Sequence, residues 1–255
     1  MSTRRRDTGA TRQAGPQPPW GGPAPAEMNP HSIVIQQAAG RPQQLILLFH
    51  GVGATPQSLL PLGQRLATAF PQATVVSVAS PHPSDLSSGY QWFSVQGITD
   101  ANRAERVAAA MPAFLAEVQG WQQAQDVTAT VTALVGFSQG AIMALESTRT
   151  QPSLAGRVVA IAGRFATLPT EPAPHTTLHL LHGKSDAVIP YRHTVEAVHH
   201  LLTLGADATA DVIPFVGHEI HPEIADLVVE RLQGHIPKRL WDEALRASPA
   251  HPKDQ

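Results

Sequence analysis

The stretch LVGFSQGAIMAL, residues 134–145, places one serine between two glycines at the junction of two apolar runs. This pattern is typical of a buried strand that turns directly into a buried helix. In that context Gly-x-Ser-x-Gly predicts a sharp, strained turn that lifts the hydroxyl of Ser138 clear of the sheet edge. A side chain at Gly136 or Gly140 would obstruct the close approach of helix and strand. The turn therefore predicts a presented nucleophile in a strand-turn-helix fold.

Short apolar runs alternate with longer amphipathic stretches along most of the chain. Strands and helices that alternate in this way form parallel sheets with helices on both faces. We therefore predict an α/β fold with a mostly parallel central sheet. The predicted strands are residues 32–36, 45–49, 73–80, 157–162, 177–182 and 209–215, with one more ending near Val135. The predicted helices are residues 57–70, 139–148, 191–204 and 222–232, with one more that takes Asn102 as its N-cap and is kinked by Pro112.

The composition excludes several classes of function. The formal net charge is -2, so bulk charge gives no reason to expect binding to nucleic acid or to an anionic membrane. There are 0 cysteines, which excludes disulfide bonds, thiolate metal sites and a cysteine nucleophile, and fits a cytoplasmic protein. Apolar runs such as residues 45–49 are far shorter than the roughly 18 residues that a membrane-spanning helix needs, so no stable membrane insertion is expected.

The two ends of the chain differ in composition from the middle. Residues 1–28 are rich in Pro and Gly and are expected to form a disordered leader, and no apolar stretch follows the basic residues 4–6 as a secretory signal would require. We expect a chain that begins at Met28 to keep full stability and activity. Residues 29–247 are expected to form a single domain that ends in the amphipathic stretch RLWDEALRA, and residues 248–255 a flexible tail.

A serine hydroxyl near neutral pH needs a base within hydrogen-bond reach, and that base needs a third group to orient it. In this architecture the order along the chain is Ser, then Asp or Glu, then His, each in a loop at the carboxyl end of a strand. Asp186 directly follows the strand 177–182, and His218 lies between the last strand and the last core helix. Weaker candidates, which lie in or near helices or inside a strand, are Asp207, Asp211 and Asp226 for the acid and His193, His199 and His200 for the base.

The oxyanion of a tetrahedral intermediate requires two further donors. One is expected from the residue after the nucleophile, which makes it the backbone N–H of Gln139. The other is expected from an early strand-end loop, and the sequence His-Gly-Val-Gly at 50–53 follows the buried strand 45–49. We predict Val52 as this second donor.

A long connection, residues 81–99, separates the third predicted strand from the next helix. Connections of this length are usually functional or disordered, and its aromatic residues argue against disorder. We predict that it forms a wall of the substrate pocket, with Tyr90, Trp92 and Phe93 as substrate-binding residues.

Taken together, FHGVG, the Trp-Phe pair, GFSQGA, SDAVIP and GHE resemble the carboxylesterase and lysophospholipase family that includes the acyl-protein thioesterases, within the α/β-hydrolase fold. The similarity covers about residues 32–245, and QWFSVQGIT and GFSQGAIMALES are long enough to be specific. It implies hydrolysis of a small-molecule ester or thioester of short acyl chain without a cofactor, with Ser138, Asp186 and His218 as the triad. One departure is Ala187, where the wider family often has proline. The choice between small esters, lysophospholipids and acylated proteins stays open, as does a homodimer.

Three alternative functions fit the sequence less well. A dienelactone-hydrolase-like activity belongs to the same fold, but its usual nucleophile is cysteine. A metal site could be built from His175, His179 and His182, but alternation along a strand places His179 and His182 on opposite faces. A non-catalytic binding module with a hydrolase fold is disfavoured by the intact set of Ser, Asp and His.

Overall fold

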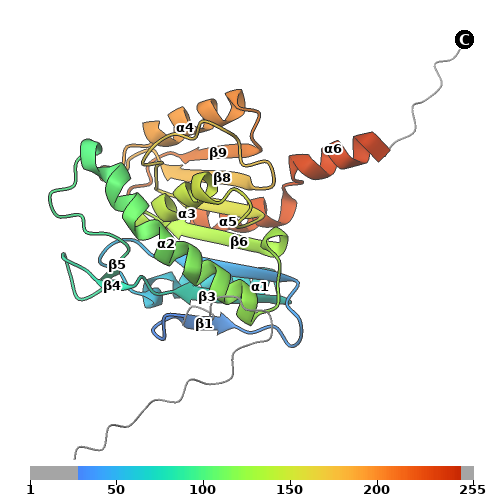
Figure 1. Cartoon of the computed structure of the whole chain (residues 1–255), viewed down its shortest axis with the longest axis horizontal. Coiled ribbons are helices and arrows are strands. Elements are labelled where there is room, and N and C mark those ends of the chain that lie inside the picture. Colours follow the sequence, from blue (N-terminus) through green and yellow to red (C-terminus); the bar gives the residue numbers. More distant parts are fainter. Residues whose placement is uncertain (1–27, 248–255) are drawn as a thin grey trace, which may run out of the picture.

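A seven-stranded sheet forms the centre of the molecule, in the order β1-β3-β2-β6-β7-β8-β9 (Figure 1). The structure is a computed structural model that describes residues 28–247. Only β1 runs antiparallel to its neighbour, and the other neighbouring pairs are parallel, which confirms the predicted sheet. The strands are β1 (Ile33–Gln36), β2 (Gln44–Phe49), β3 (Ala73–Val78), β6 (Thr132–Phe137), β7 (Arg157–Ile161), β8 (Thr177–Gly183) and β9 (Ala208–Ile213).

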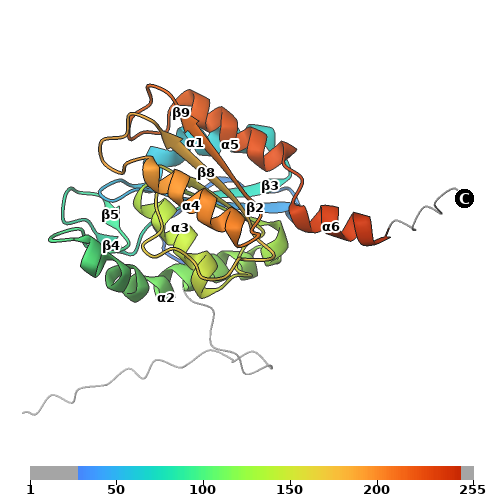
Figure 2. The same ribbon diagram turned by 90° about the horizontal axis from the view of Figure 1, so that it is seen from above.

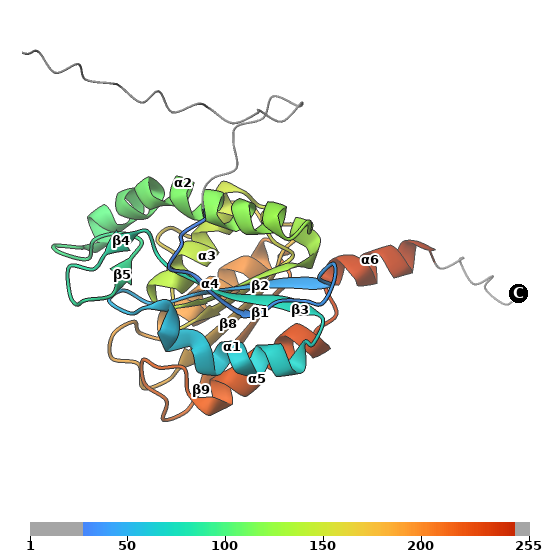
Figure 3. The same cartoon turned by 90° about the horizontal axis from the view of Figure 1, so that it is seen from below.

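Helices cover both faces of this sheet (Figures 2 and 3). One face carries α1 (Leu60–Ala69) and α5 (Pro222–Gly234). The opposite face carries α2 (Asp100–Ala124), α3 (Gln139–Thr150) and α4 (Arg192–Thr203). The layers are those of the α/β-hydrolase fold.

Alternate side chains of each central strand enter two separate hydrophobic cores. In β2, Leu45, Leu47 and Phe49 join the core beneath α2 and α3, whereas Ile46 and Leu48 join the core beneath α1 and α5. Side chains of a strand point alternately to its two faces, so a strand covered on both sides must be apolar throughout. This is why the sequence of β2 is a continuous apolar run.

One predicted helix start was wrong. The N-cap of α2 is Thr99 and not Asn102, because the Thr99 hydroxyl accepts a hydrogen bond from the Asn102 amide at 3.3 Å while the Asn102 side chain accepts one from the Thr99 amide at 2.8 Å. Asn102 therefore closes a capping box from the third helical position. The helix predicted at 57–70 is divided into a 3₁₀ turn, η1 (Pro56–Leu59), and α1.

The connection 81–99 contains a short antiparallel pair, β4 (His82–Pro83) with β5 (Tyr90–Gln91). A second 3₁₀ turn, η2 (Ala129–Val131), precedes β6. The amphipathic stretch at the end forms α6 (Lys238–Ala247), which extends away from the sheet (Figure 1).

The predicted leader and flexible tail lie outside the described residues, apart from Met28, which packs against the core beneath α2. Within residues 28–247, none of the helices combines the length and the apolar character that a membrane crossing demands.

Candidate active site

Ser138 lies at the junction of β6 and α3 in a strained backbone conformation. Its φ is 52° and its ψ is -114°, a region that residues with a side chain rarely adopt. A Cβ atom added at Gly136 would lie 2.4 Å from the carbonyl oxygen of Gly140, and one added at Gly140 would lie 2.2 Å from that of Phe49. These contacts confirm the steric role predicted for both glycines.

His218 lies between the serine and a carboxylate. Its Nε2 is 2.9 Å from Ser138 Oγ, and its Nδ1 is 2.7 Å from Asp186 Oδ2. Because a carboxylate only accepts, Nδ1 carries the hydrogen and Nε2 is free to accept the serine proton. The ring of Phe137 packs on that of His218 with the centroids 5.0 Å apart. The structure thus brings together the three side chains that the order of strand ends predicted.

The second oxygen of Asp186 is held by its own loop. Oδ1 accepts hydrogen bonds from the amides of Val188 and Ile189, both at 2.8 Å. Burial raises the pKa of Asp186, but the hydrogen bonds from His218 and from these two amides outweigh it, so the net pKa lies below the ordinary value. The group therefore stays a carboxylate near neutral pH and fixes the orientation of the His218 ring.

A second histidine contacts the same carboxylate. His182, at the end of β8, is fully buried, and its Nε2 lies 3.1 Å from Asp186 Oδ2 and 2.7 Å from the carbonyl oxygen of Ile189. Both partners accept, so Nε2 carries the hydrogen, and Nδ1 accepts from the Thr194 hydroxyl at 2.8 Å. Burial lowers the pKa of His182, so the ring is a neutral donor. From the sequence, His182 was predicted only as a possible metal ligand, and its contact with Asp186 was not predicted.

The loop 50–53 packs directly on the serine. A Cβ atom added at Gly51 would lie 3.2 Å from Ser138 Cβ. Among the described residues, the N–H groups of Val52 and Gln139 have no hydrogen-bond partner, so both are free to donate. His50 holds this loop, because its Nδ1 donates to the Gly51 carbonyl at 2.8 Å while its Nε2 accepts from the amide of Ser80 at 3.3 Å.

Two of the three aromatic residues predicted in the connection 81–99 are almost fully buried. Trp92 and Phe93 are 2% and 6% exposed, and the Trp92 ring packs edge-on against Phe114 with the centroids 5.0 Å apart. Tyr90 is half-buried and stacks on His31. The backbone of Trp92 and Phe93 is instead fixed by the Gln139 side chain, which accepts from the Trp92 amide and donates to the Phe93 carbonyl, both at 2.8 Å. Substrate contact by these aromatic residues stays a prediction.

The weaker acid candidates are engaged elsewhere: Asp207 pairs with His235, Asp211 with Arg231 and Asp226 with Arg65. Of the weaker bases, His193 lies beside Arg164 and His200 contacts the carbonyl oxygen of Pro169, while His199 is also on α4. His179 contacts Arg157 and Thr209, on the opposite face of β8 from His182. In the part of the chain that the structure describes, there is no group of three His, Cys, Asp or Glu residues that could hold a metal ion.

Comparison with known proteins shows the family of this chain. The phospholipase/carboxylesterase family matches residues 30–236. Esterase YpfH of Escherichia coli strain K12 is 47% identical over 216 residues, which cover 84% of this chain and 93% of that protein. The crystal structure of esterase PE8 superimposes with a TM-score of 0.71 at 26% identity, over 80% of this chain and 97% of that one.

A carboxylesterase from Mesorhizobium loti has the same fold, with a TM-score of 0.66 at 21% identity over 80% of this chain and 100% of that one. The resemblance inferred from FHGVG, GFSQGA and GHE is therefore confirmed, and the match extends from one end of the sheet to the other. This chain belongs to the phospholipase/carboxylesterase family.

Proposed function

We propose that this protein is a serine esterase that hydrolyses carboxylic esters or thioesters of short acyl chain through an acyl-enzyme on Ser138. Membership of the phospholipase/carboxylesterase family makes it an ester hydrolase. The mechanism rests on one observation, the ring of His218 within hydrogen-bond distance of both Ser138 Oγ and Asp186 Oδ2.

Acylation begins when His218 Nε2 takes the proton of Ser138 and the serine oxygen attacks the acyl carbon. The carbonyl oxygen becomes an oxyanion, which accepts hydrogen bonds from the N–H groups of Val52 and Gln139. The tetrahedral intermediate collapses, the bond to the alcohol or thiol breaks, and His218 returns the proton to that leaving group. The ester bond is thereby exchanged for one between the acyl group and Ser138.

Deacylation repeats these steps with water. His218 removes a proton from the water, the resulting hydroxide attacks the acyl carbon, and the proton passes to Ser138 as the acid leaves. Asp186 remains ionised throughout, since its role is to hold the ring and to stabilise the imidazolium that forms twice per turnover. No step requires a cofactor.

Exposed apolar side chains on the surrounding loops support an apolar acyl group. Leu86, Val188 and Phe215 are 63%, 67% and 96% exposed, and each lies in a segment that follows the carboxyl end of a parallel strand. Exposed apolar groups near one site favour an apolar ligand. We infer that they border the path of the acyl chain.

A fluorophosphonate probe tests this function. The intact chain should be labelled at Ser138 and should hydrolyse p-nitrophenyl acetate, whereas Ser138→Ala should lose both. Ser147→Ala, which removes a buried hydroxyl from the same helix, is the matched control and should keep both. An unlabelled wild-type chain with no esterase activity would instead support the alternative, a non-catalytic binding module.

A panel of p-nitrophenyl esters of rising chain length, with one acyl thioester, one lysophospholipid and one acylated peptide, separates a small-ester carboxylesterase from a lysophospholipase or an acyl-protein thioesterase. We expect the highest kcat/KM for short acyl chains on small leaving groups.

Two further expectations belong to this proposal. A cytoplasmic location fits the lack of cysteine in the sequence, and cell fractionation checks it. A homodimer is checked by light scattering.

A further inference from the structure

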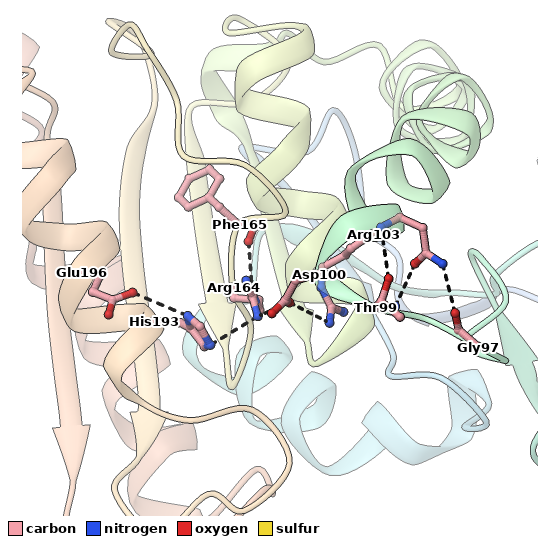
Figure 4. A network of polar contacts seen from close by, with 9 residues as sticks. Gly97, Thr99, Asp100, Arg103, Arg164, Phe165, His193 and Glu196 are labelled. Atoms are coloured by element: carbon pink, nitrogen blue, oxygen red, sulfur yellow. Dashed lines mark hydrogen bonds and ion pairs between the residues drawn. The ribbon is translucent and has the colours of Figure 1, made fainter.

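Two arginines and one aspartate form a cluster between α2, the loop after β7 and α4 (Figure 4). Arg164 Nη1 lies 3.2 Å and Arg103 Nη2 3.5 Å from the same oxygen of Asp100. The two arginine side chains are only 20% and 19% exposed, whereas that of Asp100 is 80% exposed. The two arginine side chains are therefore largely buried, whereas the carboxylate of Asp100 is exposed to solvent.

This cluster lies at the same sheet edge as the nucleophile. The amide of Ser138 donates to the carbonyl oxygen of Ile161 at 2.9 Å, and Arg164 follows only three residues later. A Cβ atom added at Gly163 would lie 2.5 Å from Cβ of Ala141, so this loop is pressed against the first turn of the helix that Ser138 begins. Arg164 is thus carried by a segment in direct contact with the nucleophile turn.

Buried interactions hold that segment in place. The carboxylate of Glu146, on α3, accepts hydrogen bonds from the amides of Ala166 at 2.6 Å and Thr167 at 3.0 Å. Arg164 Nε donates to the carbonyl oxygen of Phe165 at 3.3 Å. A guanidinium anchored in this way is preorganised, which lowers the entropic cost of binding a ligand.

Across the described part of the chain, only one carboxylate is in direct contact with the two guanidinium groups. Among the described residues, Arg103 Nε is buried without a hydrogen-bond partner, and an orphaned donor of this kind calls for an unseen partner. Burial, followed by the nearby charge of Arg103, lowers the pKa of Arg164. His193 Nε2 faces Arg164 Nη1 at 3.3 Å, and burial and that arginine lower the pKa of His193, so the neutral ring is favoured and adds no charge to the cluster. Glu196, 62% exposed, contacts only the far side of His193.

We propose that Arg103 and Arg164 bind a carboxylate carried by the ester substrate, and that Asp100 occupies this position in the free enzyme. Guanidinium groups bind carboxylates through charge-assisted hydrogen bonds whose fork geometry matches the ligand. The substrate class is then an ester whose acyl chain or leaving group bears a negative charge. This inference rests on the proposed esterase function.

Matched ester pairs test the inference. On the acyl side, the mono-p-nitrophenyl ester of adipic acid is compared with p-nitrophenyl hexanoate, which has the same chain length and no charge. On the leaving-group side, 4-acetoxybenzoate is compared with its methyl ester. The measured quantity is the ratio of kcat/KM for the charged ester to kcat/KM for the neutral one.

In at least one pair, Arg103→Gln and Arg164→Gln should each lower this ratio by about tenfold or more, since each removes a charge-assisted hydrogen bond. Asp100→Asn should raise it, because the competing carboxylate is gone, and 0.5 M salt should lower the wild-type ratio. Arg65→Gln is the matched control, because Arg65 forms a comparable pair with Asp226 on the opposite face of the sheet and should leave the ratio unchanged.

A cluster with a purely structural role would give the opposite pattern. The inference is overturned if both arginine variants keep the ratio within twofold of wild type in both pairs, or if Asp100→Asn lowers it. Should Arg164→Gln fail to fold, Arg103→Gln and Asp100→Asn still decide the question. A failed esterase function would look different, because the wild-type chain would then cleave none of the four esters.

Discussion

The parallel strands of the sheet end at one side, here called the carboxyl edge, and begin at the other, the amino edge. Each edge carries a hydroxyl, a carboxylate and an imidazole, but the three groups contact one another in a different order. At the carboxyl edge His218 lies between Ser138 and Asp186. At the amino edge Asp207 is in the middle, because the Thr177 hydroxyl donates to its Oδ2 at 2.6 Å and His235 Nε2 donates to its Oδ1 at 3.0 Å. The same three kinds of group therefore form two different arrangements, with the imidazole in the middle at one edge and the carboxylate in the middle at the other.

The order decides what each group of three can do. The hydroxyl of Thr177 donates to the carboxylate of Asp207, which also accepts from His235 and from the amide of Lys238. The ring nitrogen of His235 is therefore not in position to take the proton of Thr177. Thr177 is also fully buried within a regular strand. The amino-edge group stabilises the chain without presenting a nucleophile.

Backbone strain shows the same difference between the edges. Within residues 28–247, four residues other than glycine have positive φ, and three of them, Ser138, Ala162 and Phe215, follow or end strands at the carboxyl edge. The fourth, Asp126, lies just after α2. Strain of this kind persists only where the surrounding structure enforces it, and it gathers at functional sites.

The hydroxyl groups give the largest expected contrast. Ser138→Ala should lower kcat by about 10⁴-fold or more, since no other group can form the acyl-enzyme. Thr177→Val, which removes the corresponding hydroxyl at the amino edge, should keep kcat within twofold. Steady-state hydrolysis of p-nitrophenyl acetate measures both, and similar losses in the two variants would contradict the distinction.

The carboxylates give the next contrast. Asp186→Asn should lower kcat by about 10³- to 10⁴-fold, because an amide at this position can favour the wrong tautomer of His218. Asp207→Asn makes the same chemical change at the other edge and should leave kcat near the wild-type value. A small effect at Asp186 would show that the histidine is held by other groups.

The N–H groups proposed to bind the oxyanion give the third expected effect. Val52→Pro removes one N–H and should cost about 10²- to 10³-fold in kcat, whereas Val52→Ala keeps the N–H and should cost little. Kinetics of the two variants, compared with their melting temperatures, separate the loss of a donor from a disturbed loop. Equal activity of the two would remove Val52 from the oxyanion site.

The pH dependence of the carboxyl edge should follow one proton. The pKa of Asp186 is lowered, so it stays charged near neutral pH, and burial lowers the pKa of His182 and of His50, which favours the neutral form of both rings. The mechanism uses one neutral imidazole, that of His218, as the base, so kcat/KM should fall by about tenfold per pH unit on the acid side. A flat profile, or a slope of two protons, would contradict this mechanism.

The smallest expected effect is on stability at the amino edge. Burial raises the pKa of Asp207, but hydrogen bonds from Thr177, Lys238 and His235 give a net lowering. A carboxyl group with a lowered folded-state pKa adds stability above its unfolded pKa, and that stability is lost as the pH falls through the folded value. Asp207→Asn should therefore cost about 1–2 kcal/mol of unfolding free energy at pH 7, and the difference should shrink below about pH 4. Urea unfolding at several pH values measures it, and a constant difference would contradict the charge argument.

Much of the fold and of the candidate site could be predicted because the signals are local. Continuous apolar runs predict strands that are covered on both faces, and the glycines around Ser138 predict the turn that the structure contains. The placement of Asp186 and His218 after consecutive strands predicts their meeting, since the carboxyl ends of parallel strands share one edge. The catalytic roles of these residues stay a proposal.

What the sequence could not reveal depends on contacts between distant segments. His50 meets Ser80 across 30 residues, and Gln139 reaches back 47 residues to the amide of Trp92. Asp100 and Arg164 are 64 residues apart. No periodicity or motif encodes such pairs, because they arise only when helices and loops pack around the finished sheet.

The sequence by itself determined the alternation of strands and helices, the glycine turn and the order of Ser138, Asp186 and His218 along the chain. The tertiary structure alone decided that His182 supports Asp186, that Trp92 is buried and that two arginines share one aspartate beside the nucleophile turn. The physical reason is that local backbone preferences are properties of a segment, whereas burial and charge balance depend on what the rest of the chain places next to it.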